Sequence, residues 1–269
     1  MEGIGPDQFL QVLSPVDQEK YQSGLPKLDR DDPKFCWVFE NMDFEQWCLA
    51  NSQVLWLTGP PECGTHEVAS HIVDLARSQD SETQPIVFYF FCSTVTGTKS
   101  IMAAFIHALL QQLISYSSPL KKISVITAFL CTLLDTVICR DSDADADLWR
   151  LIKNPDCSPE LKIRKILDVS SVNGHWHANA IKQILHIEQE QGLTIIIDGL
   201  DEAKDQKTGF IKEICGFITH LKQQTCKFKV LLTSQPQIEI KALLEGLSCI
   251  EYDIERKGSV LLCIFSTSS

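Results

Sequence analysis

Two glycines five positions apart follow an apolar run and precede a helical pattern, which is the arrangement of a phosphate-binding loop. The run QVLWLT leads into Gly59, Pro60, Pro61, Glu62, Cys63, Gly64, Thr65 and His66. In the pattern G-x-x-x-x-G-K-[ST], backbone N–H groups and a helix N-terminus hold phosphates, and the last two residues add a cation and a Mg²⁺ ligand. Here Thr65 stands at the lysine position and His66 at the hydroxyl position. Glycines at this spacing also occur in ordinary turns, so the motif alone decides little.

Carboxylates follow a second apolar run, in the segment TIIIDGLDEA. Asp198 ends this run, and Asp201 and Glu202 come directly after it. The carboxyl ends of parallel strands form the crevice in which ligands bind, so we expect Asp198 to hold the Mg²⁺ of a bound nucleotide, directly or through water. In an active site Glu202 would orient the attacking water, with Asp201 as the second catalytic candidate. The alternative is that these acids only cap and solvate the next helix.

A third apolar run, in KVLLTSQP, ends in Thr233, Ser234 and Gln235 before a proline. Polar groups at this position are expected to contact the γ-phosphate of a nucleotide. Three strand ends, near residues 58, 198 and 233, therefore carry polar or glycine-rich segments in the same order along the chain. Together they predict the sheet of a P-loop NTPase, which no single motif would do.

The elements that position these residues follow from short apolar runs that alternate with helical patterns. The predicted strands are Gln53–Leu57, Ile86–Phe91, Thr194–Ile197, Phe228–Leu232 and Cys249–Tyr252. The predicted helices are Glu67–Ser78, Ser100–Ser115, Leu120–Ile138, Leu161–Val169, His177–Gln191, Gly209–Gln223 and Ile238–Leu244. Alternating strands and helices predict an α/β fold with a parallel sheet and right-handed crossovers.

Composition limits the function classes. The chain has 269 residues, 44% of them hydrophobic, and its net charge of −11 argues against a nucleic-acid or membrane-surface binder. Its 11 cysteines include no C-x-x-C pair, so neither a disulfide framework nor a zinc ribbon is indicated. The N-terminus has no secretory signal pattern. We therefore expect a cytoplasmic protein with no nucleic-acid or membrane partner.

Three segments imitate other functions. The stretch Ile123–Cys139 carries a single charge, Asp135, and is short for a membrane span, so we expect a core-facing helix. The acidic run at 141–152 resembles a calcium loop but lacks the required Gly and Glu, which predicts a solvated turn. His175 and His177 lack a third ligand placed by sequence, so no metal site is predicted there.

The chain is predicted to divide into three parts. Residues 1–34 form a polar lead-in, residues 35–257 the P-loop domain, and residues 258–269 a short tail. The tail is expected either to add an edge strand or to result from truncation of a longer protein.

With these motifs on the page, the sequence resembles the NACHT-type P-loop NTPases of fungal NOD-like receptors and their nephrocystin-3-like N-terminal relatives. The resemblance covers most of the chain and rests on Cys36 and Trp37 with FEQW after them, QVLWLTGPP, VFYFFCS with ALLQQL after it, IIIDGLDEA, and LLTSQP with CIEYD after it. It implies a three-layer fold with a five-stranded parallel sheet flanked by helices. It also implies a signal-transducing switch that binds ATP or GTP with Mg²⁺ and drives oligomerisation. Family members continue into a winged-helix part, which we expect this chain to lack.

Four departures from the family pattern concern phosphate binding. Thr65 replaces the lysine, His66 a Ser or Thr, Glu62 a glycine, and Gln235 a frequent arginine. A charge-assisted hydrogen bond contributes about 1.5–3 kcal/mol, so loss of the lysine alone is expected to weaken binding about ten- to a hundredfold.

We therefore expect weak or absent nucleotide binding, no tightly retained cofactor and negligible hydrolysis. Protein partners or self-association are expected instead. Two alternatives remain open: an active ATP- or GTP-dependent switch that drives oligomerisation, and a nucleotide-free protein-interaction module.

Overall fold

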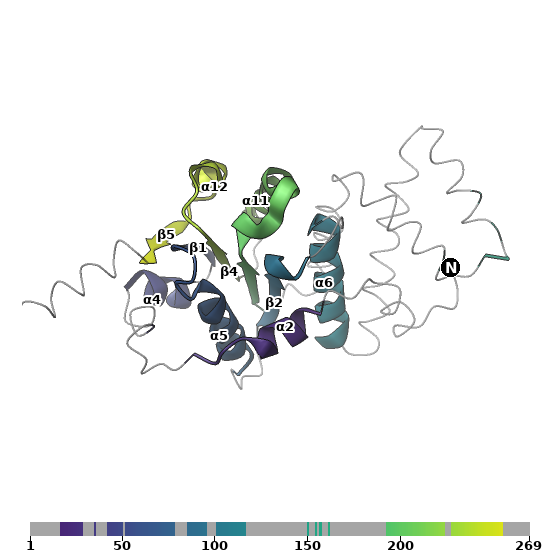
Figure 1. Ribbon diagram of the computed structural model, residues 1–269, viewed down its shortest axis with the longest axis horizontal. Helices are drawn as coiled ribbons and strands as arrows, with labels where there is room; N and C mark the ends of the chain where they lie inside the picture. The colour runs from purple at the N-terminus through teal and green to yellow at the C-terminus, as the bar shows by residue number, and fades with distance from the viewer. Residues whose placement is uncertain are drawn as a thin grey trace, which may run out of the picture. The chain divides into compact units, whose positions relative to one another are not determined.

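The computed structural model describes residues 17–28, 35, 42–50, 52–78, 85–95, 101–116, 150, 154, 156–157, 161, 192–223 and 227–254. The chain divides into two compact units, and the one that contains the predicted motifs comprises Asp17–Thr96 and Gln189–Ser269 (Figure 1). The predicted helices at 120–138 and 177–191 lie outside the described residues, as do His175, His177 and the tail at 258–269. So do nearly all of the predicted helix at 161–169 and of the acidic run at 141–152.

A parallel sheet of five strands, in the order β2-β3-β4-β1-β5, forms the centre of this unit. The strands are β1 (Ser52–Thr58), β2 (Ile86–Phe91), β3 (Leu193–Asp198), β4 (Phe228–Ser234) and β5 (Ile250–Asp253). Every neighbouring pair is parallel. The predicted α/β fold with a five-stranded parallel sheet flanked by helices is thus confirmed, and the predicted strand ends differ from the observed ones by at most two residues.

The strands are continuous apolar runs because both faces of the sheet are covered. Side chains alternate between the faces, so Leu55 and Leu57 belong to one core cluster, whereas Trp56 between them lies outside that cluster. Phe90, on the second face, contacts Phe210 at 6.1 Å between ring centroids. Burial on both sides is what a parallel sheet requires, since helices cross over each of its faces.

Helices form the outer two layers. On one side lie α4 (Met42–Leu49) and α5 (Thr65–Arg77), and on the other α11 (Lys207–Gln223) and α12 (Ile238–Leu244), as Figure 1 shows. Trp47 on α4 is buried and donates its indole N–H to the carbonyl of Val230 at 3.1 Å.

A short helix, α2 (Gln18–Gly24), lies within the stretch predicted as a polar lead-in. Gln18 is buried, accepts a hydrogen bond from the Phe91 backbone N–H at 2.7 Å, and donates one to Thr94 Oγ1 at 2.7 Å. Gln22 is also buried and donates to Asp74 Oδ1 on α5 at 2.9 Å. This helix is therefore held to the core by two buried amide side chains, together with Tyr21, whose ring lies 5.2 Å from that of Phe91.

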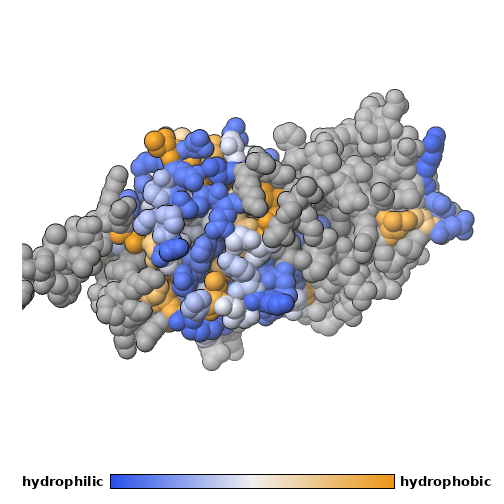
Figure 2. All heavy atoms as spheres, viewed as in Figure 1, coloured by the Kyte–Doolittle hydropathy of each residue, from blue (hydrophilic) through white to orange (hydrophobic). Residues whose placement is uncertain are grey.

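The other described elements are 3-10 helices and an α-helix of the other unit. They are η1 (Cys92–Thr94), η2 (Leu200–Gln206), η3 (Glu245–Leu247) and α6 (Ile101–Tyr116). Within the described part of the chain, none of the helices has the length and apolar character that a membrane span needs. On the face shown in Figure 2, the described surface is mainly hydrophilic, with hydrophobic residues in small separate spots.

Candidate functional site

The predicted phosphate loop connects the carboxyl end of β1 to the first turn of α5. Gly64 is the N-cap of α5 and has a left-handed backbone, with φ of 91°. A Cβ atom on Gly64 would lie 2.4 Å from the Phe35 ring, and one on Gly59 would lie 2.5 Å from Cys63 Sγ. A side chain at either position would displace a neighbouring side chain of the fold, whether or not a ligand binds, and at Gly64 it would also have to adopt the positive φ.

Glu62 also has a left-handed backbone, with φ of 64°, and its side chain is exposed. Glu62 stands where the family pattern has a glycine, the residue that adopts a positive φ most readily. Such a conformation costs a non-glycine residue about 1–2 kcal/mol. The backbone at position 62 thus has the conformation of a glycine, whereas the side chain is a carboxylate.

Thr65 and His66 begin α5, directly after the loop. His66 Nδ1 lies 2.5 Å from Asp198 Oδ2, and His66 Nε2 lies 3.3 Å from Glu202 Oε1. The side chain of Asp198 is 1% exposed, whereas those of His66 and Glu202 are 35% and 34% exposed. The histidine of the loop thus bridges two of the three predicted carboxylates.

This bridge changes the charge state of His66. The hydrogen bond with Asp198, followed by that with Glu202, raises the pKa of His66 from 6.5 to about 11, although burial acts in the opposite direction. His66 is therefore an imidazolium at neutral pH, and the site contains a positive charge that the loop motif does not predict.

Asp198 has a second partner on its other oxygen. Thr233 Oγ1 donates to Asp198 Oδ1 at 2.7 Å and accepts from the Gly199 backbone N–H at 2.9 Å. Because β3 and β4 are neighbours, the ends of these strands bring the two side chains together. Both carboxylate oxygens of Asp198 are therefore hydrogen-bonded within the chain.

Glycine at position 199 lets Glu202 fold back toward His66. Gly199 has φ of 73°, and a Cβ atom there would lie 3.2 Å from Glu202 Cδ. The Glu202 backbone N–H donates to the Gly199 carbonyl at 2.9 Å, which closes the turn that follows β3. The sequence GLDE thus forms a tight turn that brings the Glu202 carboxylate to the second ring nitrogen of His66.

The remaining predicted site residues make structural hydrogen bonds. Asp201 Oδ1 accepts from the Gln235 backbone N–H at 2.9 Å, which ties η2 to the segment after β4. Ser234 Oγ accepts from Trp56 Nε1 at 3.0 Å and donates to the Gln235 carbonyl at 2.9 Å. Thr233 faces Asp198 while Ser234 faces Trp56, because successive strand residues point to opposite faces of the sheet.

Two free cysteines lie close to these groups. Burial raises the pKa of Cys63 above its ordinary value, and burial together with Asp198 and Glu202 raises the pKa of Cys92 well above it. Both are therefore protonated thiols rather than nucleophilic thiolates.

Among the described residues, no group of three or more His, Cys, Asp or Glu side chains is arranged to hold a metal ion.

The pairing of His66 with Asp198 is the part of the site that sequence reasoning missed. The two residues are 132 positions apart, so no local pattern reports their contact. A signal was present, however: a histidine at the hydroxyl position of the loop faces the acid that the same reasoning placed at the end of β3. An imidazole at that position fits a carboxylate better than it fits Mg²⁺, which prefers oxygen ligands.

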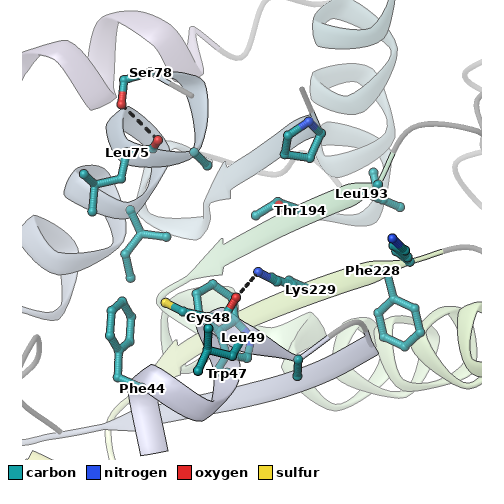
Figure 3. Close-up of a pocket in the computed structure, with 16 residues that line it drawn as sticks. Phe44, Trp47, Cys48, Leu49, Leu75, Ser78, Leu193, Thr194, Phe228 and Lys229 are labelled. Atoms are coloured by element: carbon teal, nitrogen blue, oxygen red, sulfur yellow. Dashed lines mark hydrogen bonds between the residues drawn. The ribbon is translucent and has the colours of Figure 1, made fainter. Parts of the chain in front are cut away.

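A hollow of about 520 Å³ lies at the other end of the sheet. Its lining includes Pro85, Leu193 and Phe228, which stand at the amino ends of β2, β3 and β4. Figure 3 shows Phe44 and Leu75 on its wall and the Lys229 amine directed at the Cys48 carbonyl, to which it donates a hydrogen bond. Ligands of open parallel sheets bind at the carboxyl ends, so this hollow is separate from the phosphate loop.

Comparisons with known proteins agree with this geometry. The chain is 27% identical over 121 residues to "Vegetative incompatibility protein HET-E-1" of Podospora anserina, an alignment that covers 41% of this chain and 9% of that protein. The chain thus spans only a small part of the length of this relative. The family described as "Nephrocystin 3, N-terminal" matches residues 34–129 and 121–235, which include the loop, the carboxylates and the end of β4. These matches confirm the resemblance drawn from the motifs, and the chain belongs to the nephrocystin 3 N-terminal family.

Proposed function

We propose that this chain is a NACHT-like signalling module of the kind found in fungal NOD-like receptors, with weak or no ATP or GTP binding and negligible hydrolysis. In place of a nucleotide-driven cycle, it acts through contacts with protein partners or with other copies of itself. The family match and the alignment with a vegetative incompatibility protein support the signalling context.

The observation that carries the proposal is a loop whose backbone keeps the glycine pattern of a phosphate loop but whose side chains lack the lysine that would bind the phosphates. Gly59 and Gly64 keep the loop shape, and Glu62 has the positive φ of a glycine. The first residue of α5, however, is Thr65 rather than a lysine. The charge of His66 is paired with Asp198 and Glu202, so the loop side chains offer no unpaired cation to the triphosphate that the backbone N–H groups would hold.

The size of the loss in affinity follows from the charges. A lost charge-assisted hydrogen bond corresponds to about ten- to a hundredfold in affinity. A carboxylate at 4 Å from a phosphate charge adds about 4 kcal/mol of repulsion at an effective dielectric of 20, which is an upper figure for an exposed side chain. Glu62 is exposed and can turn away, so Thr65 is the larger of the two effects.

Titration of the full chain with a fluorescent ATP analogue in the presence of Mg²⁺ tests the proposal. The parent is expected to show no saturable binding in the micromolar range. The triple variant Glu62→Gly, Thr65→Lys and His66→Ser restores the family residues and is expected to bind at least about tenfold more tightly than the parent.

A control for non-specific charge effects is Thr219→Lys, which adds one positive charge to the exposed face of α11. This variant is expected to bind the analogue no better than the parent. Micromolar, Mg²⁺-dependent binding by the parent, or equal affinities of parent and triple variant, would contradict the proposal.

A further inference from the structure

The side chain of His66 lies between the two carboxylates that the family pattern reserves for the metal. One ring nitrogen lies 2.5 Å from Asp198 Oδ2 and the other 3.3 Å from Glu202 Oε1. A neutral imidazole carries only one N–H group and would direct a lone pair at one of these oxygens. The geometry therefore favours a ring that is protonated on both nitrogens and donates an N–H group toward each carboxylate.

Both carboxylate oxygens of Asp198 already accept a hydrogen bond from a side chain of the folded chain. Oδ1 accepts from Thr233 and Oδ2 from His66, and the side chain is 1% exposed. A carboxylate binds Mg²⁺ at about 2.0–2.1 Å within a nearly ideal octahedron, and the ion keeps several waters. Direct binding of the ion to Oδ2 would require His66 to leave Asp198.

The residue type at this position also disfavours the ion. The family pattern supplies a hydroxyl oxygen here, whereas His66 supplies nitrogen donors that already point at carboxylates. The Mg²⁺ site that the family implies therefore does not fit this chain. What does fit is a positive charge covalently attached to the loop.

We propose that the His66 side chain takes the place of Mg²⁺, as a built-in cation that joins the phosphate loop to Asp198 and Glu202 and makes the folded site independent of divalent ions. The inference rests on the proposed function, because a chain that used a Mg²⁺-nucleotide would need these carboxylates for the metal. It extends that function, since it explains how the charges of Asp198 and Glu202 are compensated in the folded chain when no metal ion is bound there.

The structural consequence is a link across the carboxyl edge of the sheet. The bridge connects the start of α5 to the end of β3 and to η2, and Thr233 extends it to β4. In a nucleotide-dependent switch such a link would form and break with the ligand. Here it is part of the folded chain.

The test is the response of thermal stability to Mg²⁺ without any nucleotide, measured on the full chain. The Tm of the parent is expected to be the same in chelator and in millimolar Mg²⁺. His66→Ser removes the cation and leaves the buried Asp198 without it, so its Tm in chelator is expected to fall by about 2–8 °C. Mg²⁺ is expected to recover part of that loss, because an ion that binds only the folded state stabilises it.

Two further variants separate charge from shape. His66→Gln keeps a polar side chain of similar length but no charge, and it is expected to lose stability and gain a response to Mg²⁺ as His66→Ser does. Glu67→Gln changes the charge of the neighbouring residue in the same helical turn and is expected to leave the parent's indifference to Mg²⁺ unchanged.

A parent that is stabilised by Mg²⁺ as much as His66→Ser, or a His66→Ser variant as stable as the parent in chelator, would overturn the inference. If the variants do not fold, calorimetric titration of the parent with Mg²⁺ decides alone: no binding heat supports the inference, and saturable binding overturns it. A parent that binds Mg²⁺ but no ATP analogue refutes the built-in cation and leaves the proposed function standing. A parent that binds the analogue tightly refutes the proposed function instead.

Discussion

Thr233 and Asp198 are joined across neighbouring strands by a hydrogen bond of 2.7 Å from the hydroxyl to the carboxylate. The same hydroxyl accepts from the backbone N–H of Gly199 at 2.9 Å, and Thr233 is fully buried. One side chain thus satisfies a buried carboxylate and a buried amide at once. The end of β3 and the turn after it depend on this threonine.

Replacement of Thr233 by valine removes the hydroxyl at nearly constant volume. The variant is expected to lose about 1–3 kcal/mol of unfolding free energy, because a buried N–H group is left without an acceptor. Urea unfolding measures the change. The matched control is Thr219→Val on α11, where an exposed threonine donates to the Cys215 carbonyl, and a loss below about 0.5 kcal/mol is expected there. Equal losses in the two variants would contradict the role of Thr233.

The two glycines Gly64 and Gly216 should respond in opposite directions to the same substitution. Gly64→Ala forces a Cβ atom against Phe35 at a φ of 91°, and a loss of at least about 2 kcal/mol is expected. Gly216 lies within α11 with open space at its Cβ position, so Gly216→Ala should gain about 0.5–1 kcal/mol. Thermal or urea unfolding of both variants tests this, and a tolerated Gly64→Ala would refute the packing of Phe35 on the loop.

Glu62 is the loop residue at which a glycine should stabilise the chain. Its φ of 64° is strained for any side chain, so Glu62→Gly is expected to raise the unfolding free energy by about 1 kcal/mol. Glu62→Ala removes the charge but keeps the strain, and no such gain is expected from it. If alanine stabilises as much as glycine, charge rather than backbone strain governs this position.

Asp74 provides a stability change that depends on pH. Burial alone would raise its pKa, but hydrogen bonds from Lys27 and Gln22 and the charge of Lys27, with a smaller contribution from His71, hold the pKa below its ordinary value of 3.8. A lowered pKa means that the contribution of the carboxylate is complete above pH 3.8 and is lost as the pH falls through the lower folded value.

A double-mutant cycle isolates this contribution. Asp74→Asn and Lys27→Met are expected to show a coupling of about 0.2–1 kcal/mol at neutral pH, because both side chains are partly exposed. The coupling should shrink as the pH falls below 3.8 and should be weaker at high salt. A coupling that grows on acidification would contradict the sign of the pKa change.

The sheet was predictable because its strands are continuous apolar runs bounded by turn residues, as in Ile86–Phe91. The sequence predicts the start of α5 at Glu67, two residues after the observed start at Thr65. The reason is that the N-cap residue is Gly64, which has no side chain to indicate a helix start. The helix α2 was not predicted at all, because its buried residues are glutamines and its sequence has no apolar stripe.

The site was predictable as a set of strand ends but not as a set of contacts. Local patterns placed Asp198 and Thr233 at neighbouring ends of the sheet, and the structure joins them. The partner of Asp198 on its second oxygen is His66, which local sequence cannot report because the pairing depends on how the whole sheet is ordered. That contact raises the pKa of His66 to about 11 and gives the site a positive charge.

The measurement that tests the central claim most directly is the affinity of the parent chain for a fluorescent ATP analogue, with and without Mg²⁺. Because Glu62 and Thr65 replace the glycine and the lysine of the family pattern, we expect no saturable binding in the micromolar range under either condition. Micromolar affinity that requires Mg²⁺ would contradict the account.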